Sequence, residues 1–129
     1  MPTPIRIIGG LPFVAGIIHA NGQLLQLEHL LLDTGSGGTV IKADHLVALG
    51  VIPLPTDPLR FLRGIGGDEA VIEKSIEELE VGELHASPFT IQMGALEYGF
   101  LMDGIIGLDF LLHTQAVIDF KALRIRSAK

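Results

Sequence analysis

The residues with the clearest chemical potential are Asp33-Thr34-Gly35-Ser36, which end the apolar run Leu30 to Leu32. Asp, Gly and Ser are common turn residues, so a turn at a strand end would explain their polarity without any chemistry. A turn does not, however, require three leucines to carry an acid to the edge of a core. A carboxylate can take a proton from water if a second group protonates or polarises the carbonyl that the water attacks. The sequence therefore marks Asp33 as the candidate catalytic group.

Two later segments are rich in glycine. Gly64-Ile65-Gly66-Gly67 lies between two strand-like runs, and Gly104-Ile105-Ile106-Gly107 leads into the helix-like segment Leu108 to His113. The first segment lacks the lysine and the long following helix of a phosphate-binding loop. It is better interpreted as a mobile lid or as an ordinary hairpin turn.

The remaining candidate ligands and nucleophiles are few. The chain has no cysteine, which excludes thiolate nucleophiles, disulfides and Cys-ligated zinc. Its five histidines are dispersed, and no pair has the short helical spacing of a zinc site. We therefore predict structural histidines, no metal and no cofactor. The histidines are His19, His29, His45, His85 and His113.

Length and composition limit the number of domains and the kinds of partner that the chain can have. A chain of 129 residues with 48% apolar and 19% charged residues predicts one globular domain over residues 1–129. A net charge of -6, with nine scattered Lys and Arg, argues against nucleic-acid binding. No run approaches the roughly 20 apolar residues of a membrane span, and no secretory signal is evident. We therefore expect a cytoplasmic protein that does not contact membranes.

Short runs of Val, Ile, Leu and Phe between Gly and Pro residues predict strands rather than long helices. The dipeptide Asn21-Gly22 predicts a hairpin between 13–20 and 24–32 because both of its residues tolerate positive φ. Short helices are expected at Lys42 to Leu49 and at Leu108 to His113, with a loop over Val51 to Pro58 between the first helix and the next strand. Further strand pairs are expected at 60–63 with 69–79, at 80–81 with 84–93, and at 116–120 with 123–126.

Taken in order, these motifs resemble the retropepsin-like aspartic proteases over nearly all of Phe13 to Arg126. Leu31 to Ser36 resembles the catalytic loop, and Gly64 to Gly67 resembles the tip of the flap that covers the substrate. Gly104 to Leu111 resembles the hydrophobic-hydrophobic-Gly motif and its helix, and Ile118-Asp119-Phe120 resembles the strand that follows. The motif pattern is most similar to the ubiquitin-shuttle and bacterial branches. The resemblance implies an all-β closed barrel with a flap hairpin and two short helices.

The resemblance also implies a mechanism and a partner. Pepsin-type chains carry two Asp-Thr-Gly loops and this chain carries one, so a two-fold homodimer would supply the second Asp33. Asp33, Thr34 and Gly35 would be catalytic, with Thr34 bonding across the axis and Ser36 donating to the aspartate. A peptide or protein substrate would meet backbone groups of the flap tip in an apolar groove. Expected substrate-binding residues are Ser36, Gly64, Ile65, Gly66, Gly67, Ile105 and Ile106.

The chain departs from the retroviral pattern at two linked positions. Retroviral members place an acid two residues after the catalytic glycine and an Arg directly after the later glycine, whereas this chain has Gly37 and Leu108. A cross-interface ion pair is therefore not expected. The terminal segments Ile5 to Ile8 and Leu123 to Ile125 are candidates for the interleaved sheet that joins retroviral dimers.

Two alternatives remain open from the sequence. A catalytically silent module of the same fold would bind extended peptides by strand addition without cutting them. A two-carboxylate hydrolase of another kind, such as a glycosidase, would pair Asp33 with Asp109 or Asp103 within one chain.

Overall fold

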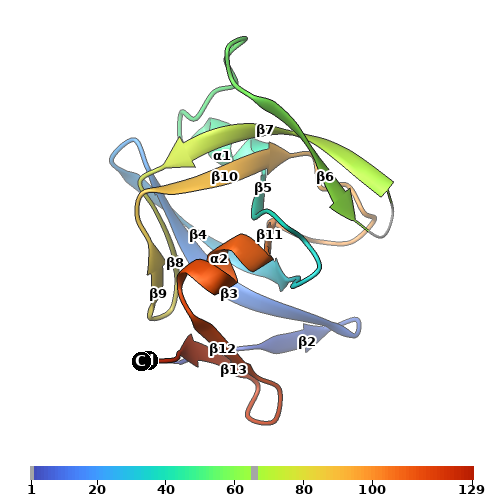
Figure 1. The fold of residues 1–129 in the computed structure, drawn as a ribbon, viewed down its shortest axis with the longest axis vertical. Helices are drawn as coiled ribbons and strands as arrows, with labels where there is room; N and C mark the ends of the chain where they lie inside the picture. The colour runs from blue at the N-terminus through green and yellow to red at the C-terminus, as the bar shows by residue number, and fades with distance from the viewer. Residues whose placement is uncertain (1, 65–66) are drawn as a thin grey trace.

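The computed structural model describes residues 2–64 and 67–129, most of which form strands (Figure 1). In chain order the first strands and helix are β1 (Thr3–Pro4), β2 (Arg6–Ile8), β3 (Leu11–Ala20), β4 (Gln23–Leu32), β5 (Val40–Lys42) and α1 (Ala43–Ala48). Then follow β6 (Leu59–Gly64), β7 (Gly67–Ile76), β8 (Glu78–Val81), β9 (Leu84–Ala86), β10 (Phe89–Gly94) and β11 (Gly104–Ile106). The chain closes with α2 (Leu108–His113), β12 (Ala116–Asp119) and β13 (Arg124–Ser127).

The hairpin of β3 and β4 forms as the sequence predicts. Asn21 and Gly22 have φ values of 52° and 72°, the left-handed conformation that a two-residue hairpin turn needs. In β3 the residues Val14 and Ile18 are fully buried, and in β4 Leu30 is fully buried. The hairpin therefore lies with one face on the core, and β4 runs from the turn directly to Asp33.

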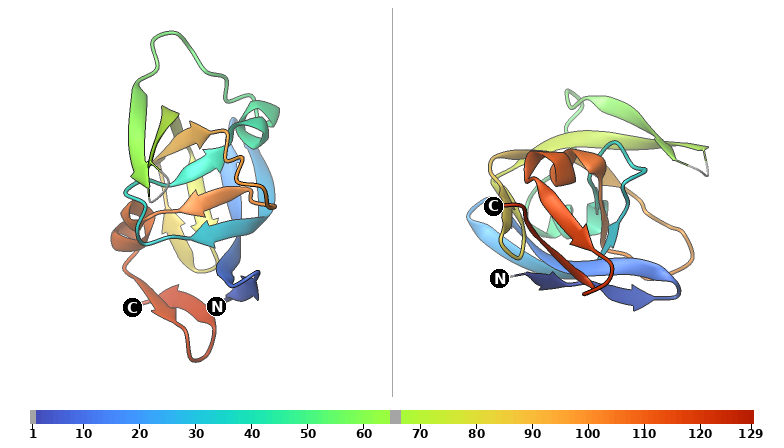
Figure 2. Two further views of the ribbon diagram at one scale, coloured as in Figure 1. Left: turned by 90° about the vertical axis from the view of Figure 1, so that its right-hand side faces the viewer. Right: turned by 60° about the horizontal axis from the view of Figure 1, so that its bottom comes forward.

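One large sheet positions the candidate loop. Its strand order is β6-β7-β10-β5-β11-β4-β3-β8-β9, with β2 added beside β3. Strand β11 pairs in parallel with β4 and antiparallel with β5, so it lies between the strands on either side of the Asp33 loop. The sheet is strongly curled (Figure 2). Among the described residues, its end strands β6 and β9 each pair with one neighbour only, so the expected closed barrel is instead a curled sheet with two ends.

The small second sheet has the order β1-β13-β12 and contains segments from both ends of the chain (Figure 2). Thr3 pairs with Ile125, and the amide of Ile5 donates to the carbonyl oxygen of Leu123 at 2.8 Å. The terminal segments therefore pair with each other within one chain. Backbone groups of both termini that a dimer sheet would use are therefore already paired within one chain.

The segment 84–93, expected as one strand, is two strands. Pro88 lies between β9 and β10 and has no N–H to continue a ladder. Strand β9 pairs with β8, whereas β10 turns away to lie between β7 and β5. Through β10, strand β7 and its hairpin partner β6 join the sheet beside β5.

The main core lies inside the curl and includes Phe110, Ile106, Ile18 and Leu30, all fully buried. A smaller cluster lies beneath the candidate site and consists of Val40, Val71, Leu96, Met102 and Ile105. Within the described residues, no helix is long and apolar enough to cross a membrane.

Candidate active site

Asp33 is fixed by the parallel pairing of β4 with β11. Leu32 lies opposite Ile106 in this pair, and the amide of Asp33 then donates to the carbonyl oxygen of Ile106 at 3.0 Å. The apolar run that precedes the acid is thus a central strand whose ladder extends to the acid itself. The backbone of Asp33 is therefore held by a segment more than 70 residues later in the chain.

The loop after Asp33 folds back on its own backbone. Gly35 donates its amide to Oδ1 of Asp33 at 2.9 Å, and the amide of Ser36 donates to the Asp33 carbonyl oxygen at 3.1 Å. The second carboxylate oxygen, Oδ2, makes no hydrogen bond to any described residue. The loop therefore orients the carboxylate through one oxygen and leaves the other for a ligand.

Ser36 does not make the predicted bond to the aspartate. Its hydroxyl donates to the carbonyl oxygen of Gly38 at 2.8 Å instead. A serine has one O–H donor, so that proton is used within the loop. The hydroxyl therefore tightens the turn, and in this chain it does not contact the carboxylate of Asp33.

A buried threonine fastens the loop to α2. The hydroxyl of Thr39 donates to Oδ1 of Asp109 at 2.7 Å and accepts the amide of Gly107 at 3.1 Å. The amide of Thr39 donates to Oδ2 of the same carboxylate at 3.2 Å. Thr39 is completely buried. Asp109 is therefore a structural residue that holds the end of the loop.

Gly107 lies where the loop and α2 approach most closely. A Cβ at this position would lie 2.4 Å from the carbonyl oxygen of Gly38 and 2.9 Å from that of Ser36. Distances this short are steric clashes with backbone, so only glycine fits without moving the loop. The amide of Leu108 also donates to the Ser36 carbonyl oxygen at 2.8 Å, which closes the contact.

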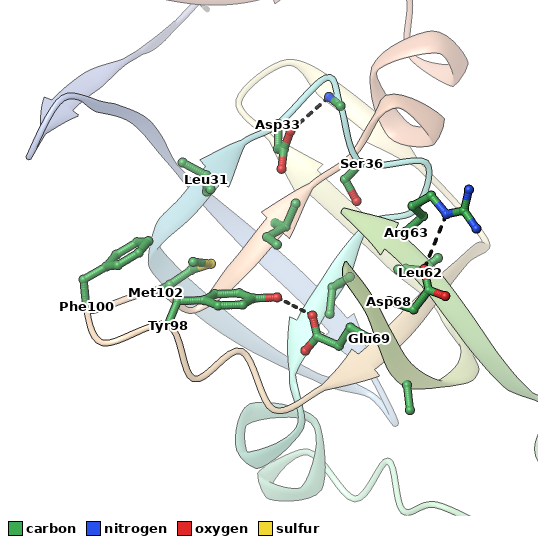
Figure 3. Close-up of a pocket in the computed structure, with 14 residues that line it drawn as sticks. Leu31, Asp33, Ser36, Leu62, Arg63, Asp68, Glu69, Tyr98, Phe100 and Met102 are labelled. Carbon is green, nitrogen blue, oxygen red and sulfur yellow. Dashed lines mark hydrogen bonds and ion pairs between the residues drawn. The ribbon is translucent and has the colours of Figure 1, made fainter. Parts of the chain in front are cut away.

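A cleft of about 590 Å³ opens beside Asp33 (Figure 3). Its walls come from the Asp33 loop, from β11, from the β6–β7 hairpin and from the segment between β10 and β11. The lining residues are Leu31, Asp33, Gly35, Ser36, Val40, Leu62, Arg63, Asp68, Glu69, Ala70, Tyr98, Phe100, Met102 and Ile105. Most of this surface is apolar, with the carboxylate of Asp33 at one side.

Successive side chains of a strand point to opposite faces of the sheet, and this alternation decides which of the expected groove residues reach the cleft. Leu31 and Ile105 lie opposite each other in β4 and β11, and both line it. Ile106 is the next residue and must point to the other face of the sheet. It is fully buried in the main core and does not line the cleft.

The hairpin expected as a flap is present as β6 and β7. Gly64 pairs with Gly67 at its end, whereas the predicted site residues Ile65 and Gly66 lie outside the described residues. Leu62 and Glu69 are cross-strand partners in this hairpin, and both side chains reach the cleft. The hairpin therefore contributes side chains to the site.

Tyr98 is a cleft residue that the sequence did not single out. Its hydroxyl donates to Oε2 of Glu69, which joins the segment before β11 to the hairpin strand β7 (Figure 3). Burial, the hydrogen bond to Glu69 and the negative charges of Glu69 and Asp33 raise the pKa of Tyr98 to about 12. The one sequence signal was its type, since Tyr98 is the only tyrosine in the chain.

The acids proposed as single-chain partners of Asp33 are engaged elsewhere. Asp103 accepts the amide of His29 at 2.9 Å, and its other oxygen lies 2.9 Å from Nε2 of His45. Asp109 is bound by Thr39, and neither acid lines the cleft. The described acids that share the cleft with Asp33 are Asp68, which lies 3.5 Å from Arg63, and Glu69.

The curled sheet, the carboxylate loop and the hairpin over a cleft define a retropepsin-like fold. A retropepsin-like aspartic protease from Rickettsia conorii superposes with a TM-score of 0.65 and 18% identity, covering 95% of this chain and 86% of that one. A family model described as aspartyl protease matches residues 18–110. The chain therefore belongs to the aspartyl protease family, and its fold is retropepsin-like. No curated protein sequence matches it.

Proposed function

We propose that this protein is an aspartic endopeptidase that acts as a homodimer, with the two Asp33 carboxylates, one from each subunit, activating a water molecule. The observation that carries the proposal is Asp33 itself, whose Oδ2 is unengaged at the side of an apolar cleft while Oδ1 is fixed by Gly35. Family membership supports the same reaction. Among the described acids of the same chain, Asp103 and Asp109 are bound elsewhere. The two acids that share the cleft, Asp68 and Glu69, contact Arg63 and Tyr98 respectively.

The chemistry follows from two like charges brought close together. Two carboxylates a few ångströms apart do not both stay ionised, so they share one proton, as is established for aspartic proteases in general. The ionised Asp33 takes a proton from water as the oxygen attacks the peptide carbonyl, and the protonated Asp33 gives its proton to the carbonyl oxygen. Collapse of the tetrahedral intermediate breaks the C–N bond, and a proton passes to the leaving nitrogen. Thr34 and Gly35 would hold the two loops in register.

An apolar surface beside the loop supports the dimer. Leu108 and Leu112 lie one turn apart on α2 and are 38% and 68% exposed. The Leu108 amide donates a hydrogen bond to the carbonyl oxygen of Ser36 in the Asp33 loop, and Thr34 in that loop is exposed. Leu108 stands where retroviral members carry the interface arginine. We infer that the subunits meet through apolar contacts here instead of an ion pair.

The substrate would lie in the cleft under the hairpin. Leu31, Leu62 and Ile105 supply apolar walls next to Asp33, which favours bulky hydrophobic residues beside the bond that is cut. The β6–β7 hairpin would act as the flap, excluding water and offering backbone groups of its tip, Gly64 to Gly67, to the peptide.

The test is cleavage of an unfolded casein-like substrate at acidic and neutral pH. We expect cleavage by the wild type that a statine-type inhibitor blocks, and none by Asp33→Asn, with circular dichroism confirming that both proteins are folded. If both proteins bind the substrate and neither cuts it, the silent peptide-binding module is correct. Equal cleavage by both would show that Asp33 is not the catalytic acid.

Mixing the two proteins tests the dimer separately. If each active unit needs Asp33 from both subunits and the chains exchange freely, an equal mixture retains about one quarter of the activity of wild type at the same total concentration. If each chain works alone, the mixture retains about one half. The second result would refute the shared site without refuting proteolysis.

A further inference from the structure

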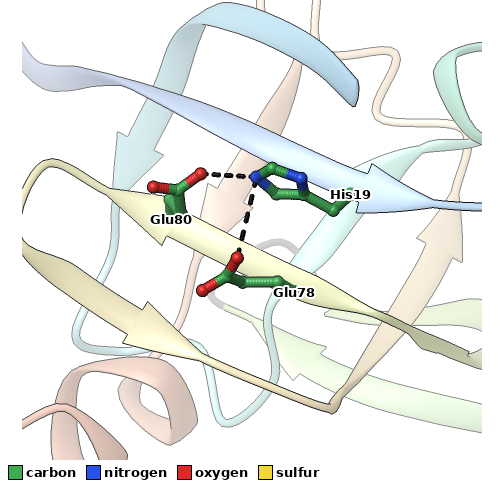
Figure 4. A group of neighbouring side chains, drawn as sticks. All are labelled: His19, Glu78 and Glu80. Atoms are coloured by element: carbon green, nitrogen blue, oxygen red, sulfur yellow. Dashed lines mark hydrogen bonds and ion pairs between the residues drawn. The ribbon is translucent and has the colours of Figure 1, made fainter. Parts of the chain in front are cut away.

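A cluster of histidine and glutamate side chains lies on the outer face of three neighbouring strands, apart from the cleft (Figure 4). His19 on β3 pairs directly with Glu78 on β8, and Glu80 on β8 pairs directly with His85 on β9. Because Glu78 and Glu80 are two residues apart, their side chains point to the same face. The intervening Leu79 is fully buried on the opposite face.

The donor atoms of three of these residues converge. Nε2 of His19 lies 2.5 Å from Oε2 of Glu80 and 3.7 Å from Oε1 of Glu78. One ligand atom from each of the three lies within 4.8 Å of the other two. Their side chains are 23–29% exposed, so the group is accessible to solvent ions but held in a partly buried sheet surface.

We propose that His19, Glu78 and Glu80 form a binding site for a divalent transition-metal ion, with Zn²⁺ as the ion of choice. Imidazole nitrogen and carboxylate oxygen are both normal zinc ligands, with bond lengths of roughly 2.0–2.2 Å. In a tetrahedral site such bonds place neighbouring ligand atoms about 3.3 Å apart. The two distances from His19, 2.5 and 3.7 Å, lie on either side of that value, so small side-chain rotations would admit the ion.

His85 supplies a further partner. Its Nδ1 lies 2.9 Å from Oε2 of Glu78 and 3.5 Å from Oε1 of Glu80, on the oxygens that do not face His19. Carboxylates that bind metals are themselves hydrogen-bonded by an outer set of residues, and this set orients them. His85 occupies that position, which leaves the fourth coordination site to water.

The site lies far from the catalytic acid and ties together distant parts of the chain. His19 faces Leu24 near the hairpin turn, and Leu32, the last residue before Asp33, is eight residues further along β4. At the rise of a strand this corresponds to about 26 Å. The ion would join β3 to β8, whose residues are about 60 positions apart in the sequence. It would therefore brace the sheet rather than take part in peptide cleavage.

Titration of the metal-free protein with Zn²⁺ at pH 7.5 tests the proposal by calorimetry. We expect one ion per chain for the wild type, loss of binding in His19→Ala and in Glu80→Gln, and binding weakened by about 10-fold in His85→Ala, the lower end for an outer partner. His113→Ala removes an exposed histidine on α2, outside the cluster, and should bind as the wild type does.

Two measurements that do not depend on activity distinguish binding at this site from nonspecific binding of the ion elsewhere on the surface. Co²⁺ should give the intense visible absorption of a four-coordinate site with the wild type but not with His19→Ala, and Zn²⁺ should raise the thermal unfolding midpoint of the wild type only. If His19→Ala does not fold, Glu80→Gln serves for the same comparison, with circular dichroism as the check. Equal Zn²⁺ binding by the wild type and both ligand variants, or no binding at millimolar Zn²⁺, would overturn the proposal and leave a metal-free ion-pair cluster.

Discussion

Replacing Thr39 by valine should loosen the attachment of the Asp33 loop with almost no change in side-chain shape. The substitution deletes the bond from the hydroxyl to Asp109, at 2.7 Å, and the bond from the Gly107 amide to the hydroxyl, at 3.1 Å. Thr39 and Gly107 are buried, so water cannot replace the hydroxyl as the partner of the Gly107 amide, whereas Asp109 is only partly buried. The amide of Thr39 keeps its own bond to Asp109.

The size of the effect follows from these two bonds. A hydrogen bond to a charged acceptor contributes about 1.5–3 kcal/mol, and a buried donor left without a partner costs about 1–3 kcal/mol. Removing the hydroxyl also removes the cost of burying it, so we expect a net loss of about 2–4 kcal/mol in the free energy of unfolding. With an m-value of roughly 2 kcal/mol per molar urea, the unfolding midpoint falls by about 1–2 M.

Urea unfolding followed by circular dichroism measures this loss, with both proteins at one concentration because dimer formation would shift the midpoint. Thr90→Val on β10 is the matched control, since Thr90 is exposed and its change should stay within about 0.5 kcal/mol. A loss for Thr39→Val as small as that of the control would refute the role given to this hydroxyl. In conditions where the variant remains folded, we also expect lower peptidase activity because the Asp33 loop is less well held.

Three further predictions follow from the same structure. Tyr98 should titrate with a pKa of about 12 by ultraviolet absorbance, and Glu69→Gln should lower that pKa towards 10; an ordinary value near 10 in the folded wild type would contradict the contact. The hydrogen bond from Lys74 lowers the pKa of Asp57, so Lys74→Met should be less stable than wild type at pH 7, and the difference should fade as the pH drops below about 4 and Asp57 is protonated. Equal loss at pH 7 and pH 2.5 would exclude that ion pair as the cause. Leu108→Glu should move the sedimentation coefficient from dimer to monomer and abolish cleavage, whereas an unchanged dimer would place the interface elsewhere.

Features encoded by neighbouring residues could be predicted from the sequence. Asn21-Gly22 specifies a hairpin because the turn conformation is chosen by these two residues alone. The short helix expected at Leu108 to His113, directly after Gly107, agrees with α2. The Asp33 loop was identified because its residue types occur together in one short segment.

Features that depend on distant pairings could not be predicted. Ile105 and Ile106 look alike in sequence, and only the register of β11 against β4 decides that the first lines the cleft and the second lies in the core. The bond between Tyr98 and Glu69 joins residues 29 positions apart. The spacing of the histidines along the chain does not reveal that the pairing of β3 with β8 brings His19 beside Glu80, 61 positions later.

The attachment of Asp33 through Ile106 and of Thr39 through Asp109 has a consequence for how the protein is made. Both contacts span about 70 residues, so the chain must close a long loop before they can form, and such non-local contacts tend to appear late in folding. A ribosome-bound fragment that ends before residue 106 contains the Asp33-Thr34-Gly35 segment but lacks both Ile106 and Asp109, which hold the loop. Under the proposed function, nascent chains would therefore lack a positioned Asp33 and could not cut neighbouring unfolded polypeptides during synthesis.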